Sequence, residues 1–263
     1  MLRAGSVSFV PFALFALVGA ACGTSSIGQP AKPPTVPALK GSITVFAASS
    51  LTAAFNDAGH AFTTANPEVK ISFSFDASSK LVGQITQGAP ADVFASADAS
   101  SMDKLTTADL NASAPVNFAT NLLSIIVAQG NPKKIRTVAD LAIPRLKVVV
   151  CDPAVPCGKY AQQSLDTAKV VLIPASLEQN VKGVVTKVTA GEADAGIVYV
   201  TDVKAAGDKA VGVDIPADAN MKATYPIASI KGSTHADINA AFIAFLTGAD
   251  GQAILAKYGF GEP

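Results

Sequence analysis

The sequence predicts an α/β fold in which mostly parallel sheets carry helices on both faces. From residue 41 onward, short runs rich in β-branched and aromatic residues alternate with stretches whose apolar residues recur at helical spacing. This alternation is typical of parallel sheets that are covered by helices. The 263 residues are enough for two lobes of ordinary domain size. In such sheets, ligands bind beyond the carboxyl ends of the strands, where helices begin.

The overall charge gives no support for a partner held by bulk electrostatics. Lys plus Arg and Asp plus Glu both number 20, so the formal net charge is zero. Proteins that hold nucleic acid or an anionic membrane through bulk charge carry a basic excess. We therefore expect no nucleic-acid partner, and any bound anion needs donors at its own site.

The first 22 residues are predicted to be a lipoprotein signal peptide. Arg3 supplies a positive start, and the mostly apolar residues 7–21 are too few for a membrane-spanning helix, which needs about 20. Small residues precede Cys22, the expected lipidation site, although Gly19 stands where such sites usually carry Leu. The alternative is a plain secretory signal with a chance cysteine. Residues 23–40 are predicted to be a flexible tether, which places the protein on the outer face of the cytoplasmic membrane, in the periplasmic or cell-wall space.

The stretch 42–55 combines a strand, two serines and the start of a helix. β-Formers occupy residues 43–46, and apolar residues recur at helical spacing from Leu51. Ser49 and Ser50 lie between them. A helix start leaves backbone N–H groups unpaired and partly positive, so these donors and the Ser50 hydroxyl suit an anion. The plainer alternative is that Ser50 only caps the helix.

Ser78 is predicted to open the second helix as Ser50 opens the first. Residues 69–75 alternate between apolar and polar, which indicates a strand, and Asp76 follows it. The helix continues through residue 88, where Gly88 is a plausible C-cap. A strand at 90–95 and a helix at 98–110 are expected next.

The same rhythm continues to the C-terminus. Asn180 is a good N-cap for a helix whose valines recur at helical spacing, and a strand at 195–200 delivers Tyr199 at its carboxyl end. Thr234 is expected to cap a later helix. The other expected strands are 121–128, 145–150, 170–173 and 224–230, and the other expected helices are 135–141, 158–165, 238–245 and 251–258.

Cys151 and Cys157 enclose a short loop that contains two prolines. If Cys22 carries lipid, these two cysteines remain as a pair in an oxidising compartment, where they can form a disulfide. Two buried thiols, or half of a metal site, are the alternatives. The metal alternative lacks further ligands, because His60 and His235 are isolated in the sequence.

The candidate donors share a position at a strand end or a helix start, and they face each other across a cleft if the chain forms two lobes. A buried oxyanion held by neutral donors needs several hydrogen bonds, because each charge-assisted bond contributes only about 1.5–3 kcal/mol. An all-donor site also favours a fully deprotonated oxyanion over a protonated phosphate, whose hydrogen needs an acceptor. The candidates are the hydroxyls of Ser50, Ser78 and Tyr199 and the turns at Cys157–Gly158 and Asn180–Val181.

A set of short segments, specific together although each is weak alone, carries a family resemblance. They are Val45-Phe-Ala-Ala-Ser-Ser-Leu51, Phe75-Asp-Ala-Ser-Ser-Lys-Leu81, Gly88-Ala-Pro-Ala-Asp-Val-Phe94, Asp152-Pro with Gly158-Lys-Tyr160, Ala195-Gly-Ile-Val-Tyr199 and Ala256-Lys-Tyr-Gly-Phe260. In this order they resemble the periplasmic molybdate-binding proteins of ABC importers. The resemblance covers the chain from about residue 41 to the C-terminus.

The resemblance implies a type II periplasmic-binding-protein fold, with two doubly wound lobes joined by two crossover segments that act as a hinge. Residues 41–121 plus 225–263 form one lobe and residues 122–224 the other. It implies molybdate or tungstate as the ligand, bound as an oxyanion without direct metal ligation, and a membrane permease as the partner of a monomer that needs no cofactor. The implied binding residues are Ser50, Ser78, the backbone at Cys157 and Val181, and the Tyr199 hydroxyl.

Two residues depart from the family pattern. Cys157 stands where a small residue such as Ala is usual, and Asp76 stands where an uncharged residue is usual. We expect Asp76 to point away from the ligand, because a carboxylate repels an oxyanion. A receptor for sulfate is an alternative that the residues do not distinguish. An enzyme is not expected, since a serine hydrolase needs a base near a strand end and a nucleophile elbow, and the sequence offers neither.

Overall fold

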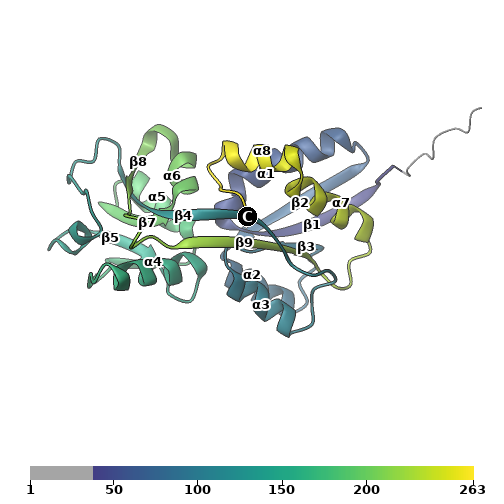
Figure 1. Ribbon diagram of the computed structural model, residues 1–263, viewed down its shortest axis with the longest axis horizontal. Helices are drawn as coiled ribbons and strands as arrows, with labels where there is room; N and C mark the ends of the chain where they lie inside the picture. Colours follow the sequence, from purple (N-terminus) through teal and green to yellow (C-terminus); the bar gives the residue numbers. More distant parts are fainter. Residues whose placement is uncertain (1–37) are drawn as a thin grey trace, which may run out of the picture. The chain divides into compact units, whose positions relative to one another are not determined.

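The computed structural model describes residues 38–263 (Figure 1). The predicted signal peptide, the lipidation of Cys22 and nearly all of the tether therefore lie outside the described residues. Within residues 38–263, no single helix is long and apolar enough to cross a membrane, although the helices Ala236–Thr247 and Ala249–Lys257 together meet that test across a 59° bend.

The first sheet is built on three parallel strands in the order β2-β1-β3, and we call it, with its helices, lobe 1. Helices cover both of its faces (Figure 1), as the alternating pattern predicts. The elements are β1 (Gly41–Ala48), α1 (Thr52–Ala65), β2 (Val69–Asp76), α2 (Ser78–Thr86), β3 (Val93–Ala95), α3 (Ala99–Thr107), α7 (Ala236–Thr247) and α8 (Ala249–Lys257).

The second sheet repeats this topology, and we call it, with its helices, lobe 2. Its parallel strands have the order β6-β5-β7, so the strand that comes first in the chain is again central. Its elements are β5 (Val148–Cys151), α4 (Pro156–Thr167), β6 (Ser176–Glu178), α5 (Val181–Thr189), β7 (Ala195–Tyr199), α6 (Val200–Ala206) and β8 (Ala210–Asp214).

Two long strands cross between the lobes. The first half of β4 (Val116–Ala128) pairs antiparallel with β9 (Lys222–Ser229), and its second half pairs with β7 and β8. In turn, β9 continues the first sheet through β3 (Figure 1). The lobe boundaries expected at 121/122 and 224/225 fall inside these two shared strands. The type II periplasmic-binding-protein architecture predicted from the sequence is confirmed.

The aromatic core of lobe 1 fixes α1 on the sheet. The Phe55 ring lies 5.7 Å from that of Phe118, 6.1 Å from that of Phe73 and 6.2 Å from that of Phe242, measured between centroids. Each pair contributes about 0.5–1.5 kcal/mol beyond the area that it buries. The start of this helix, where Ser49 and Ser50 lie, is therefore held firmly at the end of β1.

Several expected elements are wrong or incomplete. Residues 170–173 form no strand, and Val171 and Ile173 are 86% and 89% exposed. The segment 176–178 pairs with β5 instead. It follows Pro174, which lacks an N–H for strand pairing. The helix at 135–141 is only a 3-10 turn, Ala139–Ala142. The helix α7 begins after His235 without a side-chain cap, so the expected cap at Thr234 is also wrong. The helix α6, the strand β8 and the antiparallel pairing of β4 and β9 were not predicted.

Candidate functional site

One cavity brings all five predicted site residues together between the lobes. It has about 210 Å³ of empty volume, part of which is open to solvent. Among the described residues that line it, Asp76 is the only one with a charged side chain. The lining residues are Ala48, Ser49, Ser50, Asp76, Ala77, Ser78, Ala97, Pro156, Cys157, Asn180, Val181 and Tyr199.

The cavity lies where both sheets deliver helix N-termini. In lobe 1, β1 leads to Ser50 and β2 leads to Ser78; in lobe 2, β5 leads to Cys157 and β6 leads to Val181. In each lobe the two strands are neighbours whose following helices leave from the same edge, which is the ligand position of doubly wound sheets. Four helix starts therefore direct unpaired N–H groups and partial positive charge toward one space.

Ser50 does not cap its helix, so the plainer alternative from the sequence is wrong. It lies within the short 3-10 turn Ser49–Leu51, which has no side-chain cap bond, and its Oγ lies 2.9 Å from the hydroxyl of Tyr225 on β9. Asn121 Nδ2 donates to the same Tyr225 oxygen at 3.3 Å, and Asn121 Oδ1 accepts from the backbone N–H of Leu122, which fixes the amide orientation. Either hydroxyl can be the donor in the Ser50–Tyr225 bond, and when Tyr225 donates, the Ser50 proton is available to the cavity.

The hydroxyl of Ser78 is held in place by a hydrogen bond from a backbone N–H. It is fully buried at the first position of α2, and its Oγ accepts a hydrogen bond of 2.9 Å from the N–H of Ala97. Because its acceptor side is occupied, the Ser78 hydroxyl is left with a proton to donate. Both serines can therefore donate a proton to a ligand in the cavity.

Tyr199 carries the most direct sign of a ligand. Its side chain is 1% exposed, and its hydroxyl has no hydrogen-bond partner within residues 38–263. Burial raises the pKa of Tyr199 well above its ordinary value, so the hydroxyl stays protonated. Its backbone N–H is held at 3.2 Å by Asp202 Oδ2. A buried hydroxyl without a partner costs free energy, which a bound acceptor recovers.

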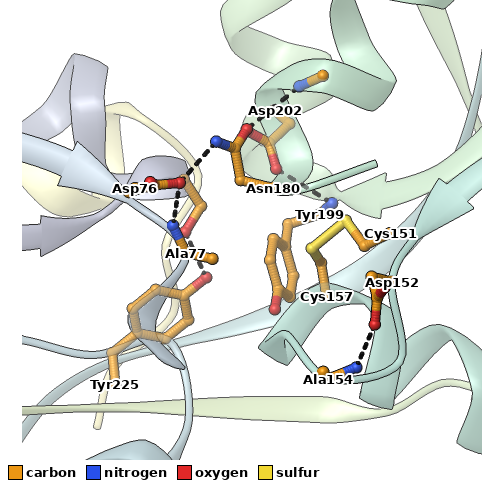
Figure 2. The surroundings of a disulfide bond; sticks show 12 residues. Asp76, Ala77, Cys151, Asp152, Ala154, Cys157, Asn180, Tyr199, Asp202 and Tyr225 are labelled. Atoms are coloured by element: carbon orange, nitrogen blue, oxygen red, sulfur yellow. Dashed lines mark hydrogen bonds between the residues drawn. A yellow bond between two sulfur atoms is a disulfide. The ribbon is translucent and has the colours of Figure 1, made fainter. Parts of the chain in front are cut away.

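Cys151 and Cys157 are joined by a disulfide, which decides between the alternatives left open by the sequence (Figure 2). Because both sulfur atoms belong to the bridge, neither residue has a free thiol, and Cys157 can bind a ligand only through its backbone. The loop packs directly on the start of α4: a Cβ at Gly158 would collide with the carbonyl oxygen of Asp152. The bridge and the glycine therefore hold the N–H groups at the start of α4 in place.

Asp76 does not point away from the cavity, so this expectation is wrong. Its Oδ1 accepts from its neighbour's N–H, that of Ala77, at 2.8 Å and from Asn180 Nδ2 at 2.9 Å (Figure 2). Asn180 belongs to the other lobe, where it caps α5 as predicted, accepting from the N–H of Gly183 at 3.3 Å. The donors around Asp76 Oδ1 explain why a carboxylate is tolerated on this wall.

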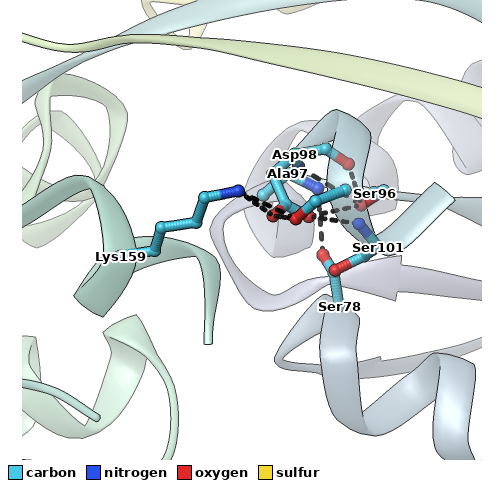
Figure 3. A network of polar contacts seen from close by, with 7 residues as sticks. Ser78, Ser96, Ala97, Asp98, Ser101 and Lys159 are labelled. Atoms are coloured by element: carbon cyan, nitrogen blue, oxygen red, sulfur yellow. Dashed lines mark hydrogen bonds and ion pairs between the residues drawn. The ribbon is translucent and has the colours of Figure 1, made fainter. Parts of the chain in front are cut away.

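A second polar contact joins the lobes outside the cavity. Lys159 Nζ, on α4, lies 2.9 Å from Ser100 Oγ and 3.8 Å from Asp98 Oδ2, both at the start of α3 (Figure 3). Sequence reasoning missed this contact and the roles of Tyr225 and Asn121. Tyr225 is 175 residues from Ser50 and Asn121 is 104 residues from Tyr225, and no local pattern marks such pairs.

The sequence profile described as "Bacterial extracellular solute-binding protein" matches residues 43–261. The chain belongs to this family. This solute-binding protein is 46% identical to the molybdate-binding protein ModA of Mycobacterium tuberculosis over 92% of each chain. It shares the fold of the Azotobacter vinelandii periplasmic molybdate-binding protein, with 19% identity, a TM-score of 0.74, and coverage of 84% of this chain and 99% of the other.

The fold of this solute-binding protein does not by itself choose a ligand. The sulfate-binding protein SubI of Mycobacterium tuberculosis has the same TM-score of 0.74, with 21% identity and coverage of 83% of this chain and 86% of the other. At such identities the likeness concerns the fold alone. The donors in the cavity must therefore carry the argument about the ligand.

Proposed function

We propose that this protein captures molybdate or tungstate between its lobes and delivers it to the membrane permease of an ABC importer. The observation that carries the proposal is a cavity between the lobes that is lined by hydroxyls able to donate, with one of them, Tyr199, buried and unpaired within residues 38–263. The 46% identity to a protein named for molybdate binding, over nearly the whole chain, supports this ligand.

The donor set is strong enough to hold a dianion without a cation. Hydrogen bonds to a charged group contribute about 1.5–3 kcal/mol each, so five donors supply roughly 7–15 kcal/mol. The helix starts add a favourable field from their dipoles. These terms oppose the loss of the hydration of the anion, and they act without the side-chain cation that many anion sites use.

Asp76 supplies a hydrogen-bond acceptor on the wall of the cavity, which affects the selectivity among oxyanions. The sequence suggested that no acceptor faces the ligand, yet this carboxylate lines the cavity. Its Oδ1 already accepts two hydrogen bonds, from Ala77 and Asn180. A protonated phosphate can give its hydrogen to the other oxygen, Oδ2, so the weak binding that we expect of phosphate rests on its smaller size, as it does for sulfate.

Thermal unfolding with a panel of oxyanions tests the proposal. A ligand at 100 times its Kd stabilises the folded state by about 2.7 kcal/mol, which raises the Tm of a chain of this size by about 5–10 °C. Molybdate and tungstate are expected to give this shift, and sulfate and phosphate at the same concentration much less. Equal shifts with sulfate and molybdate would assign the protein to the sulfate receptors instead.

The remaining part of the proposal concerns location and assembly. We propose a monomer without catalytic activity or cofactor, anchored through lipid on Cys22 to the outer face of the cytoplasmic membrane. His60 and His235, the two histidines, do not line the cavity, which supports binding without chemistry. Cys22→Ser is expected to move the protein from the membrane fraction to the soluble fraction, and retention in the membrane fraction would contradict the anchor.

A further inference from the structure

We propose that Asp76 and Asn180 form a clasp that holds the two lobes closed and slows the release of the bound oxyanion. The clasp is the hydrogen bond of 2.9 Å from Asn180 Nδ2 to Asp76 Oδ1, between residues 104 positions apart in the chain. The inference rests on the proposed function of the same cavity, because it assigns the clasp a role in ligand release.

The two residues occupy equivalent places in the two lobes. Asp76 ends β2 and stands two residues before Ser78, while Asn180 follows β6 and directly precedes Val181. The bond therefore ties together the two helix starts that direct donors into the cavity (Figure 2). When the lobes separate, the clasp must break, and when it forms, α2 and α5 are fixed relative to each other.

Both side chains are held ready for this contact. Asn180 Oδ1 accepts from the N–H of Gly183, so the amide presents Nδ2 to the opposite lobe. Asp76 Oδ1 accepts from the N–H of Ala77, which fixes the carboxylate on its own strand end. Because little side-chain freedom is lost on closure, the bond between an amide and a charged acceptor favours the closed state.

Asp76 places a negative charge on the wall of the cavity. A carboxylate on the wall of an anion cavity repels the ligand, and the repulsion is strong where water is excluded. Asp76 thus lowers the affinity unless it also contributes to closure. The N–H donors at its Oδ1 and the positive starts of α2 and α5 offset its charge. A role in closure accounts for a residue that is otherwise unfavourable at this place.

The contact of Lys159 with Asp98 and Ser100 differs from the clasp in two respects. The Lys159 side chain is 42% exposed, and the residue does not line the cavity. We therefore assign the control of release to the clasp, whose two residues line the cavity.

An exchange of the two side chains tests the clasp. Asn180→Asp keeps an N-cap acceptor for α5 but sets a second carboxylate against Asp76. The double variant Asp76→Asn/Asn180→Asp restores an amide–carboxylate pair with donor and acceptor exchanged, and its net charge equals that of the wild type. Gln179→Glu is the matched control, because Gln179 is exposed, neighbours Asn180 and lies outside the cavity lining.

Release is measured on the purified full chain loaded with radiolabelled molybdate and chased with excess unlabelled molybdate. Asn180→Asp is expected to release it at least tenfold faster than the wild type, the double variant to return within threefold, and Gln179→Glu to stay within twofold. Unchanged release in Asn180→Asp would overturn the clasp. So would a double variant that releases as fast as Asn180→Asp, since the effect would then come from position 180 alone.

Small-angle scattering of the ligand-free variants provides a readout that does not depend on binding. The radius of gyration is expected to increase in Asn180→Asp and to return to the wild-type value in the double variant; equal values in all variants would refute the clasp. A wild-type chain that retains no molybdate would refute the proposed function, while scattering still decides whether the clasp closes the lobes. Thermal unfolding of each variant verifies that it is folded.

Discussion

The two lobes repeat one strand order but supply different donors to the cavity. Lobe 1 contributes the side-chain hydroxyls of Ser50 and Ser78, each of which is hydrogen-bonded to a group outside its own helix. We propose that lobe 2 contributes backbone N–H groups at Cys157 and Val181, together with the Tyr199 hydroxyl; all three residues line the cavity. The same topology therefore produces one half that depends on side chains and another that depends mainly on the conformation of its loops.

This difference explains which neighbours each lobe needs. A hydroxyl rotates, so lobe 1 needs the Tyr225 hydroxyl and the N–H of Ala97 to hold the hydroxyls of Ser50 and Ser78 in place. A backbone N–H moves only with its loop, so lobe 2 needs the disulfide at the start of α4 and the Asn180 cap at the start of α5. Substitutions should therefore act on affinity in lobe 1 and more on stability in lobe 2.

Removal of both lobe 1 hydroxyls is expected to have the largest effect. Ser50→Ala/Ser78→Ala deletes two donors to a buried charge, at about 1.5–3 kcal/mol each, which corresponds to roughly a 10²–10⁴-fold loss of molybdate affinity. Calorimetric titration measures this loss. Ser79→Ala is the matched control, because Ser79 neighbours Ser78 but does not line the cavity, and its affinity should stay within twofold. A double variant with wild-type affinity would show that lobe 1 does not hold the ligand.

Phenylalanine variants of Tyr199 and Tyr225 are expected to have different effects, because we propose that Tyr199 donates to the ligand while Tyr225 supports Ser50. Tyr199→Phe is expected to weaken molybdate binding by about 1.5–3 kcal/mol without lowering the Tm of the ligand-free protein, because its hydroxyl has no partner there within residues 38–263. Tyr225→Phe removes the bonds to Ser50 and Asn121 and should destabilise the ligand-free protein by about 1–2 kcal/mol. Calorimetry and thermal unfolding of both variants measure the contrast. A lower ligand-free Tm in Tyr199→Phe would mean that its hydroxyl is already satisfied.

The disulfide is expected to act first on stability. The bridge closes a loop across a sequence separation of 6, and the loss of so short a loop costs about 2 kcal/mol, or about 4–8 °C in Tm. Cys151→Ser/Cys157→Ser should show this shift and a smaller loss of affinity, because the N–H groups at the start of α4 lose their support. An unchanged Tm would show that Gly158 and the packing of the loop hold this helix start without the bridge.

The smallest expected effect is that of alkaline pH. Burial raises the pKa of both Tyr199 and Tyr225 above the ordinary value near 10, so neither hydroxyl ionises as the pH rises from about 7 to 9.5. Affinity for molybdate measured by calorimetry should therefore stay level over this range. An ionised Tyr199 would carry a negative charge and no proton, so a decline in affinity with a midpoint below pH 10 would contradict this assignment.

The order of elements around the site could be predicted from the sequence, because it depends on local patterns. The apolar periods and the serines after two strands place Ser50 and Ser78 at helix starts, and the set of motifs identified the family, which the comparisons confirm. The same reasoning failed where an outcome depends on distant residues. Asp76 lines the cavity and is hydrogen-bonded to Asn180, which lies 104 residues later in the chain. Ser50 is hydrogen-bonded to Tyr225 on β9, and no sequence pattern predicts that contact.

Strand assignments failed for a related reason. The apolar run at 170–173 has the composition of a strand but finds no partner, because residues 176–178 pair with β5 instead. The crossing of β4 and β9 depends on antiparallel pairs between distant segments, which alternation alone does not reveal. Composition thus reports the tendency to form a strand, and the sheet decides which segment is paired.

Anomalous diffraction from molybdenum in crystals of the complex tests the central claim, that uncharged donors from both lobes hold the anion. We predict one molybdenum peak in the cavity, with its oxygens within hydrogen-bond distance of the Ser50, Ser78 and Tyr199 hydroxyls and of the N–H groups at Cys157 and Val181, and with no Lys or Arg nitrogen within about 4 Å of those oxygens. A peak elsewhere, or a Lys or Arg side chain in contact with the anion, would contradict the account.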